Sequence, residues 1–208
     1  IVVGSGKGAS LGILIKKAES LEKAHKITAI AFDKTGTITQ GRPDVHVFQD
    51  LSGEESRALI LALSLESQSE HPLARSVVAF AKSKNASELP VKNFTAKTGL
   101  GVTGAIEGKT YHMGSSRYLE QLGLSGKATP AIAALQEKGY TVLILSDESK
   151  ALALFGVQDG VKPTSKTAIE LLRRRGIRTI MITGDNEKVA RHIAEEVGID
   201  EVHSQVTP

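Results

Sequence analysis

The residues best suited to chemistry form a short polar string that directly follows an apolar run. Residues 33–37 read Asp-Lys-Thr-Gly-Thr, and residues 27–32 before them are mostly apolar, which predicts a buried strand. An aspartate at the C-terminal end of such a strand is exposed and can attack phosphorus as a carboxylate nucleophile. The amides and hydroxyls that follow can receive phosphate oxygens. A lone aspartate here would more often be a capping residue, but the complete string, which includes Lys34 and Thr35, favours Asp33 as a nucleophile.

The residue two positions after Asp33 bears on the fate of a phosphorylated aspartate. Many phosphatases with this strand-and-loop design have a second aspartate there, which acts as the general acid and base of dephosphorylation. This chain has Thr35 instead, so an aspartyl phosphate is expected to persist long enough to drive another process. A soluble phosphatase with a large cap is therefore the less favoured interpretation, and a module that only holds a nucleotide is a third.

A second polar string ends another apolar run. Residues 183–186 read Thr-Gly-Asp-Asn and follow the predicted strand 178–182. The carboxyl ends of parallel strands meet at one edge of a sheet, so we expect Thr183, Gly184 and Asp185 to lie beside the first string. A threonine hydroxyl and a glycine amide there can hold a phosphoryl group. Taken alone, the four residues would be an ordinary turn and helix cap.

Two further segments favour a nucleotide site. Residues 66–74 read Glu-Ser-Gln-Ser-Glu-His-Pro-Leu-Ala, and Pro72 is typical of a first helical turn. A histidine held there by a neighbouring carboxylate can present its ring to a purine, whereas a lone histidine is more often a surface or capping residue. Glycines at 99, 101 and 104 allow a ligand to approach the backbone closely. The dinucleotide-binding interpretation of these glycines fails, because no βαβ unit surrounds them.

The elements that must position these residues fall into three segments. Residues 1–41 and 157–208 have strand–helix alternation, and they flank an α+β insert at 42–156. Turn-forming residues at 40–43 and 158–160 predict breaks at both junctions. Apolar spacing predicts helices within 9–24, 52–64, 71–82, 117–122, 130–138, 164–175 and 187–197, and strands within 45–48, 91–113, 141–146 and 151–157. A further strand is expected to start at 201–202.

Composition narrows the class of protein. The 208 residues are 40% hydrophobic and 24% charged, which is normal for a folded globular chain. There is no cysteine, so disulfides and thiolate metal sites are excluded. The net charge is only +3, and no dense Lys/Arg run with interleaved aromatics exists, so nucleic acid is not expected as a partner. The sequence contains no run of 18 or more apolar residues, so no membrane span is predicted.

The motifs together resemble one family. Asp-Lys-Thr-Gly-Thr-Ile-Thr at 33–39 resembles the phosphorylation motif of P-type ATPases, with Ile in place of the usual Leu. Residues 183–186 and 159–163 resemble the family's second phosphate-binding motif and its hinge motif. Ser-Glu-His-Pro-Leu-Ala at 69–74 resembles the nucleotide-binding domain of heavy-metal-transporting members. The resemblance implies an α/β fold: a haloacid-dehalogenase-like Rossmannoid phosphorylation domain with an inserted α+β nucleotide-binding domain of antiparallel sheet and helices.

The resemblance also implies ligands and the residues that bind them. It implies ATP and Mg²⁺, with the metal at Asp33 and Thr35. The nucleotide-binding residues that it implies are Glu66, Ser69, Glu70, His71, Gly99, Gly101, Val102, Gly114 and Ser115. The family has a Gly-Asn pair near adenine where this chain has Gly114-Ser115. Serine keeps a hydrogen bond there but loses the reach of the amide.

Finally, the resemblance implies a larger parent. The family's Gly-Asp-Gly-x-Asn-Asp stretch would follow residue 208, so the phosphorylation domain is expected to be incomplete and its phosphorylation impaired in isolation. The partners implied are membrane and actuator domains of the same polypeptide, at the cytoplasmic face of a membrane, with the transported heavy-metal ion bound elsewhere. Residues 6–16 resemble copper exporters slightly more than zinc or cadmium exporters, so Cu⁺ is the expected ion and Zn²⁺ or Cd²⁺ the alternative.

Overall fold

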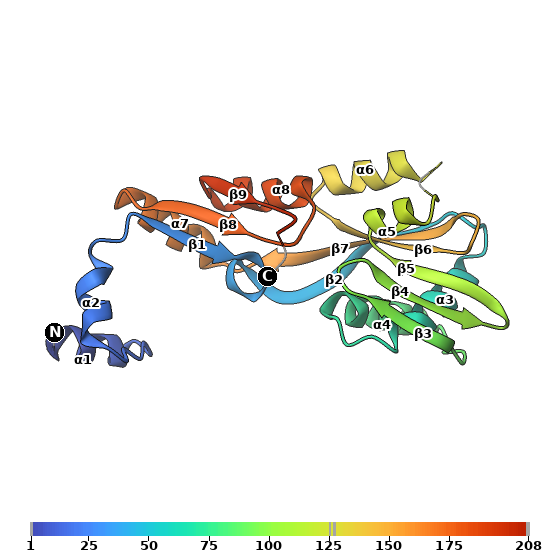
Figure 1. Ribbon diagram of the computed structural model, residues 1–208, viewed down its shortest axis with the longest axis horizontal. Helices are drawn as coiled ribbons and strands as arrows, with labels where there is room; N and C mark the ends of the chain where they lie inside the picture. Colours follow the sequence, from blue (N-terminus) through green and yellow to red (C-terminus); the bar gives the residue numbers. More distant parts are fainter. Residues whose placement is uncertain (1, 125, 127, 207–208) are drawn as a thin grey trace.

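A small parallel sheet, here called sheet A, carries both polar strings. The computed structural model describes residues 2–124, 126 and 128–206, and in it sheet A has the strand order β1-β8-β9 (Figure 1). Its strands are β1 (Ala29–Asp33), β8 (Arg178–Ile182) and β9 (Glu201–His203). Asp33 is in register with Ile182, so both polar strings begin at the same edge of the sheet.

Two amphipathic helices, α7 (Ser165–Arg174) and α8 (Glu187–Val197), complete the core of sheet A. In α8 the buried residues Val189, Ala190, Ile193, Ala194 and Val197 recur at helical spacing. Asn186 caps the start of α8 by accepting a hydrogen bond of 2.9 Å from the Lys188 amide. Gly198, with φ of 82°, ends it.

The second sheet, sheet B, is antiparallel throughout and has the order β2-β7-β6-β5-β4-β3. Its strands are β2 (Thr39–Asp50), β3 (Lys92–Lys97), β4 (Gly101–Ile106), β5 (Lys109–Gly114), β6 (Thr141–Ser146) and β7 (Ala151–Val161). The predicted hairpin at 141–157 is confirmed as β6 and β7, and the glycine-rich segment 91–113 provides three short strands.

Helices cover both faces of sheet B. The helices α3 (Glu55–Glu66) and α4 (Pro72–Ser83) pack on one face, and α5 (Ser116–Gln121) and α6 (Thr129–Glu137) on the other. Strand β6 contributes side chains to both faces: Leu143 and Leu145 join the core under α3 and α4, while Val142 and Ile144 join the core under α5 and α6. Successive side chains of a strand alternate between faces, so a continuous apolar run fits a strand that is buried on both sides.

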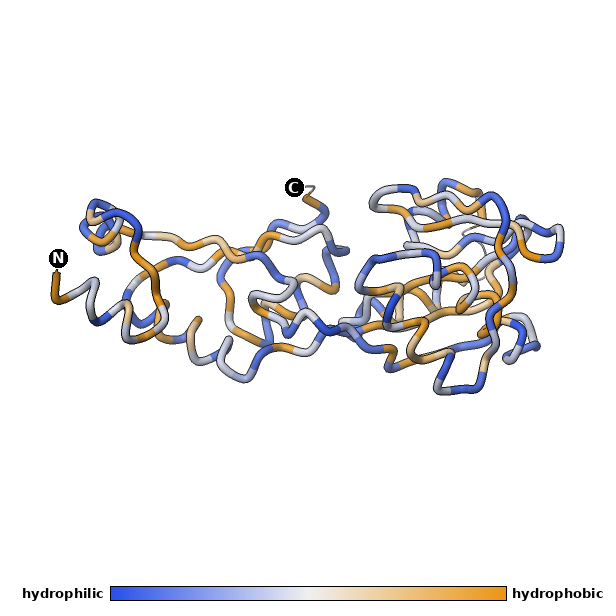
Figure 2. The backbone as a smooth tube through the Cα atoms, turned by 90° about the horizontal axis from the view of Figure 1, so that it is seen from below, coloured by the Kyte–Doolittle hydropathy of each residue, from blue (hydrophilic) through white to orange (hydrophobic). Residues whose placement is uncertain are grey.

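The two sheets are joined by β2 and β7, which run from one to the other as a narrow neck (Figure 2). The sequence predicts breaks in secondary structure at 40–43 and 158–160. This prediction is wrong, because both segments lie inside these strands. The backbone absorbs the turn-forming residues in a register shift between Thr39 and Pro43, which is where a strand tolerates proline. The boundaries at 41/42 and 156/157 fall within the strands and stay predictions.

The N-terminal segment lies at one end of the molecule (Figure 1). The single helix expected within 9–24 is wrong: α1 (Val2–Ser10) and α2 (Ala18–Ala24) are separate. Gly12, with φ of 78°, and the β-branched residues after it oppose helix continuation. Neither helix has a buried residue. Among the described residues, no helix is both long enough and apolar enough to cross a membrane.

Candidate phosphorylation and nucleotide site

Asp33 is exposed at the edge of sheet A that faces the neck. The loop Lys34–Ile38 follows it and turns at Gly36, whose φ of 75° suits glycine. Thr35 and Thr37 are also exposed. This is the arrangement expected of a carboxylate that meets an incoming group beside hydroxyl and amide donors.

A buried ion pair joins the two polar strings. Lys34 is only 7% exposed, and its ammonium pairs with the Asp185 carboxylate. The Thr183 hydroxyl accepts a hydrogen bond of 3.2 Å from the Asp185 amide. Gly184 is exposed, and the nearest atom to a methyl group placed on it would be 3.6 Å away. The structure thus brings Lys34, Thr183, Gly184 and Asp185 together beside Asp33, while their chemical roles remain predictions.

Asp159 fixes the phosphorylation loop to the neck through contacts that the sequence did not predict. The buried Asp159 carboxylate accepts hydrogen bonds from the Thr39 hydroxyl at 2.5 Å and from the Gly41 and Arg42 amides at 3.1 Å each. Lys162 donates to the Gly36 carbonyl at 2.5 Å. The sequence marked 159–163 as a hinge motif, but no local signal shows that Asp159 pairs with a residue 120 positions away.

The nucleotide residues lie where elements of sheet B end toward the neck. Helix α3 runs antiparallel to β4: Arg57 near its start pairs with Glu107 at 2.5 Å, and Leu65 near its end packs against Gly104. Glu66 ends α3 and is only 5% exposed. Burial raises the pKa of its carboxyl to about 7, so near neutrality this group exists in both the protonated and the ionised form.

His71 caps helix α4 with its own ring. Its Nδ1 accepts a hydrogen bond of 3.2 Å from the Leu73 amide, and its amide donates to the Ser69 hydroxyl at 3.3 Å. The expectation that a neighbouring carboxylate holds this ring is therefore wrong, because a backbone amide holds it. The residue is exposed, and so is Glu70, for which the structure gives no contact with His71.

The predicted glycines have a structural cause in the pairing of β4 with β5. Gly101 is in register with Gly114, and a methyl group on Gly101 would lie 2.2 Å from the Met113 carbonyl oxygen. One on Gly114 would lie 2.4 Å from the Leu100 carbonyl oxygen. Backbone packing alone therefore requires glycine at both positions, whereas Gly99, with φ of 72° and open space around it, serves the preceding turn.

The remaining two predicted residues play different parts. The Ser115 amide donates to the Leu100 carbonyl at 2.8 Å, and its hydroxyl caps α5 by accepting from the Tyr118 amide at 3.3 Å. Ser115 thus ties the 98–101 loop to the end of β5. Val102 is buried in the core that includes α3, so its place in the nucleotide site stays a prediction. The sequence did not single out Lys97, whose ammonium lies 5.0 Å from the Tyr118 ring centre beside this loop.

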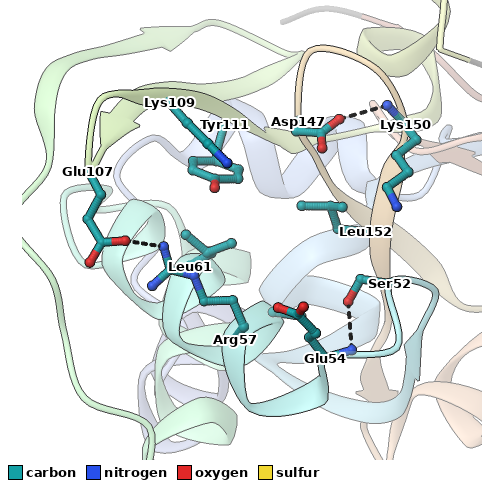
Figure 3. A pocket seen from close by; sticks show the side chains of 11 residues that line it. Ser52, Glu54, Arg57, Leu61, Glu107, Lys109, Tyr111, Asp147, Lys150 and Leu152 are labelled. Atoms are coloured by element: carbon teal, nitrogen blue, oxygen red, sulfur yellow. Dashed lines mark hydrogen bonds and ion pairs between the residues drawn. The ribbon is translucent and has the colours of Figure 1, made fainter.

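A separate hollow of about 300 Å³ opens at the opposite end of α3 (Figure 3). Acidic and basic groups line it in equal number, namely Glu54, Glu107, Asp147, Arg57, Lys109 and Lys150. Arg57 is paired with Glu107, and Asp147 accepts from the Ser149 and Lys150 amides of its own turn. The balanced charge gives no preference for a polyanion such as ATP, and none of the predicted site residues lies in it.

Comparison with known proteins defines the class. The family model of haloacid dehalogenase-like hydrolases matches residues 27–207, and the chain belongs to this family. Over the whole chain it is 41% identical to a copper-transporting P-type ATPase of Rhizobium leguminosarum and 36% identical to a copper-exporting P-type ATPase of Vibrio cholerae. It spans 25% and 23% of the length of these two relatives.

Solved structures define the class more narrowly. The nucleotide-responsive catalytic domain of the CPx-ATPase CopB-B superposes with a TM-score of 0.73 at 28% identity, over 97% of this chain and 70% of that one. A zinc-transporting PIB-type ATPase in its E2.Pi state superposes with 0.70 at 29% identity, over 99% of this chain and 34% of that one. The α/β fold predicted from the sequence is confirmed, and the chain matches the catalytic domains of CPx-type P-type ATPases.

The oxygen ligands at the phosphorylation site suit a Mg²⁺ ion that is also bound by substrate phosphates. No group of three or more His, Cys, Asp or Glu side chains among the described residues could hold a metal. Asp33 offers a free carboxylate, whereas Asp185 is neutralised by Lys34. Protein-bound Mg²⁺ commonly uses one or two carboxylates together with substrate phosphates and water. The residues therefore fit a metal that arrives with a nucleotide.

Proposed function

We propose that this chain is the ATP-binding and aspartyl-phosphorylation portion of an ATP-driven heavy-metal cation exporter that transports Cu⁺. The observation that carries the proposal is the meeting of two strand ends at one edge of sheet A. The exposed Asp33 lies there beside Thr183 and Gly184, joined through the Lys34–Asp185 ion pair. The two copper-transporting relatives support the choice of ion.

In this mechanism ATP binds to the neck-facing end of sheet B. The exposed His71 ring meets the adenine, and Glu66 supports it. With a pKa near 7, the protonated form of Glu66 offers the purine both a donor and an acceptor. Gly99 and Gly101 let the nucleotide approach the backbone, and Ser115 adds a hydrogen bond.

Phosphoryl transfer then takes place at sheet A. A carboxylate oxygen of Asp33 forms a bond to the γ-phosphorus while the bond from that phosphorus to the β–γ bridging oxygen breaks, so that ADP leaves and an aspartyl phosphate remains. Thr35, Thr183 and Gly184 hold the phosphoryl oxygens. Asp33 and Thr35 would hold Mg²⁺, and the metal would supply neutralisation of the charge on the phosphates. No second aspartate follows to hydrolyse the product, since Thr35 occupies that position.

The setting of the chain is part of the proposal. Residues 1–41 and 157–208 form the phosphorylation domain, and 42–156 form the nucleotide-binding domain. Membrane and actuator domains of the same parent polypeptide place the chain at the cytoplasmic face of a membrane. The structural similarity to a zinc-transporting ATPase makes a Zn²⁺ or Cd²⁺ exporter the second candidate.

An ATP titration of the wild-type chain and of His71→Ala by calorimetry tests the nucleotide site. We expect saturable binding by the wild type and roughly tenfold weaker binding by the variant, a loss of about 1.4 kcal/mol. His25→Ala, at an exposed position beyond α2, is the control and should bind as the wild type does. A folded wild-type chain that does not bind ATP would contradict the nucleotide site.

Phosphorylation is tested separately. With ATP and Mg²⁺, a hydroxylamine-sensitive phosphoryl adduct that is lost in Asp33→Asn supports the proposed mechanism. Sustained hydrolysis of p-nitrophenyl phosphate would instead favour the soluble phosphatase. ATP binding without any adduct would indicate a chain that only holds the nucleotide.

A further inference from the structure

Helix α6 of sheet B contacts helix α8 of sheet A, outside the neck formed by β2 and β7. Two interactions stand out in this contact. The Lys188 ammonium lies 2.9 Å from the Glu137 carboxylate. The His192 ring lies against the bare Cα of Gly139, since a methyl group placed there would be 2.3 Å from His192 Cδ2.

Gly139 serves two purposes at once. With φ of 82° it ends α6, and the amides of Gly139 and Tyr140 donate to the Gln136 and Leu135 carbonyls at 3.0 and 3.1 Å. Because the residue has no side chain, the same turn leaves a flat surface that a ring on the other half can occupy. Any other residue would push the two helices apart.

The contact lies on the face of sheet B that must move away from sheet A when the nucleotide-bearing half closes onto Asp33. Helix α6 covers one face of the sheet, and α3 and α4, which carry Glu66 and position His71, cover the other. A hinge rotation about β2 and β7 that brings the α3–α4 face toward Asp33 moves the opposite face away from α8.

We propose that the α6–α8 contact is a latch that holds the two halves in the open arrangement, and that closure of the nucleotide-bearing half onto Asp33 must break it. The proposal rests on the function proposed above for its closing step, but the latch itself is a property of the nucleotide-free chain. The ion pair is exposed and therefore weak, so the latch opens readily when a ligand bridges the two halves.

Distances between spin labels on the two halves test the latch directly. The chain has no cysteine, so Lys82→Cys on α4 and Lys166→Cys on α7, both exposed, give a single labelled pair. Without nucleotide, we expect Gly139→Ala to shift or broaden the distance distribution. The double variant with His192→Ala should shift the distribution back toward that of the wild type, because removing the ring makes room for the methyl group while the Lys188–Glu137 ion pair remains.

Gly176→Ala is the matched control. Gly176 ends α7 with φ of 71° and donates from its amide to the Arg173 carbonyl at 2.9 Å, but it has open space around it. Both alanine variants therefore carry the same backbone strain, and only one meets His192. A Gly139→Ala distribution identical to the wild type, or an equal change in Gly176→Ala, would overturn the latch.

Charge variants provide a test that does not depend on glycine. Glu137→Lys should raise the ratio of open latch to closed latch up to about fivefold, and Glu137→Lys with Lys188→Glu should reverse the change. With ATP, the wild-type distribution should move toward that of Gly139→Ala, and an unchanged distribution despite bound ATP would overturn the coupling to closure. If ATP does not bind at all, the nucleotide proposal fails while the nucleotide-free comparison still decides the latch.

Discussion

At the residue scale, the site combines groups that the sequence reveals with groups that only the fold reveals. The string at 33–37 predicts an exposed nucleophile after a buried strand, because strand patterning is a local property. The burial of Lys34 and Glu66 is not local: it depends on Asp185 from a distant string in one case and on the packing of α3 in the other. The partners of Asp159 depend on the neck in the same way.

Glu66 gives a prediction about pH. Its folded-state pKa of about 7 lies above the ordinary glutamate value of 4.5, so between these values the folded chain keeps a proton that the unfolded chain has released. The free energy of unfolding must therefore fall as pH rises from 4.5 to 7, by on the order of 3 kcal/mol from this group. Urea unfolding at pH 5 and pH 8 should show this loss in the wild type and a smaller one in Glu66→Gln. Equal pH dependence in both proteins would contradict it.

At the element scale, strand and helix positions follow from apolar spacing, whereas irregularities do not. The helix α8 lies where the spacing places it, because its apolar stripe, its asparagine cap and its terminal glycine agree. The segments 40–43 and 158–160 were misjudged because glycine and proline usually end strands. Here β2 continues through a register shift in its pairing with β7, and the Asp159 carboxylate accepts hydrogen bonds from the Gly41 and Arg42 amides within the shifted segment.

The pairing of β4 with β5 predicts the cost of a side chain at Gly101. Its φ of 155° and a methyl-to-carbonyl distance of 2.2 Å should make Gly101→Ala destabilising by about 2–4 kcal/mol. Gly108→Ala is the control, because its φ is 79° but its surroundings are open, and it should cost about 1–2 kcal/mol. Denaturant unfolding compares them, and equal losses would show that the close contact has no energetic effect.

The link between loop and neck predicts the effect of Asp159→Asn. An amide cannot accept all three hydrogen bonds as strongly as a carboxylate, so we expect the free energy of unfolding to fall by about 2–3 kcal/mol. Asp44→Asn, at an exposed position of β2, should change it by less than about 0.5 kcal/mol. Thermal unfolding measures both, and a silent Asp159→Asn would show that the network does not stabilise the neck.

At the scale of the whole molecule, the sequence predicts the order of the segments but not their relative placement. The rhythm of strands and helices indicates an insert between two α/β segments, and the two sheets agree with that expectation of fold. The α6–α8 contact has no sequence signal, because Gly139 looks like any helix-ending glycine until His192 is seen against it. Such contacts depend on how two rigid bodies meet, which short-range patterns do not encode.

The neck has an evolutionary consequence. Pro43 and Asp159 are neighbours across the β2–β7 ladder, so the polypeptide between them leaves and returns at nearly the same point, about 5 Å apart. A stretch of gene that encodes such a segment can be gained, exchanged or lost without stretching the chain on either side. The segment is thus suited to domain insertion. Placed between two adjacent strands of another protein, it would need no linker to span a gap.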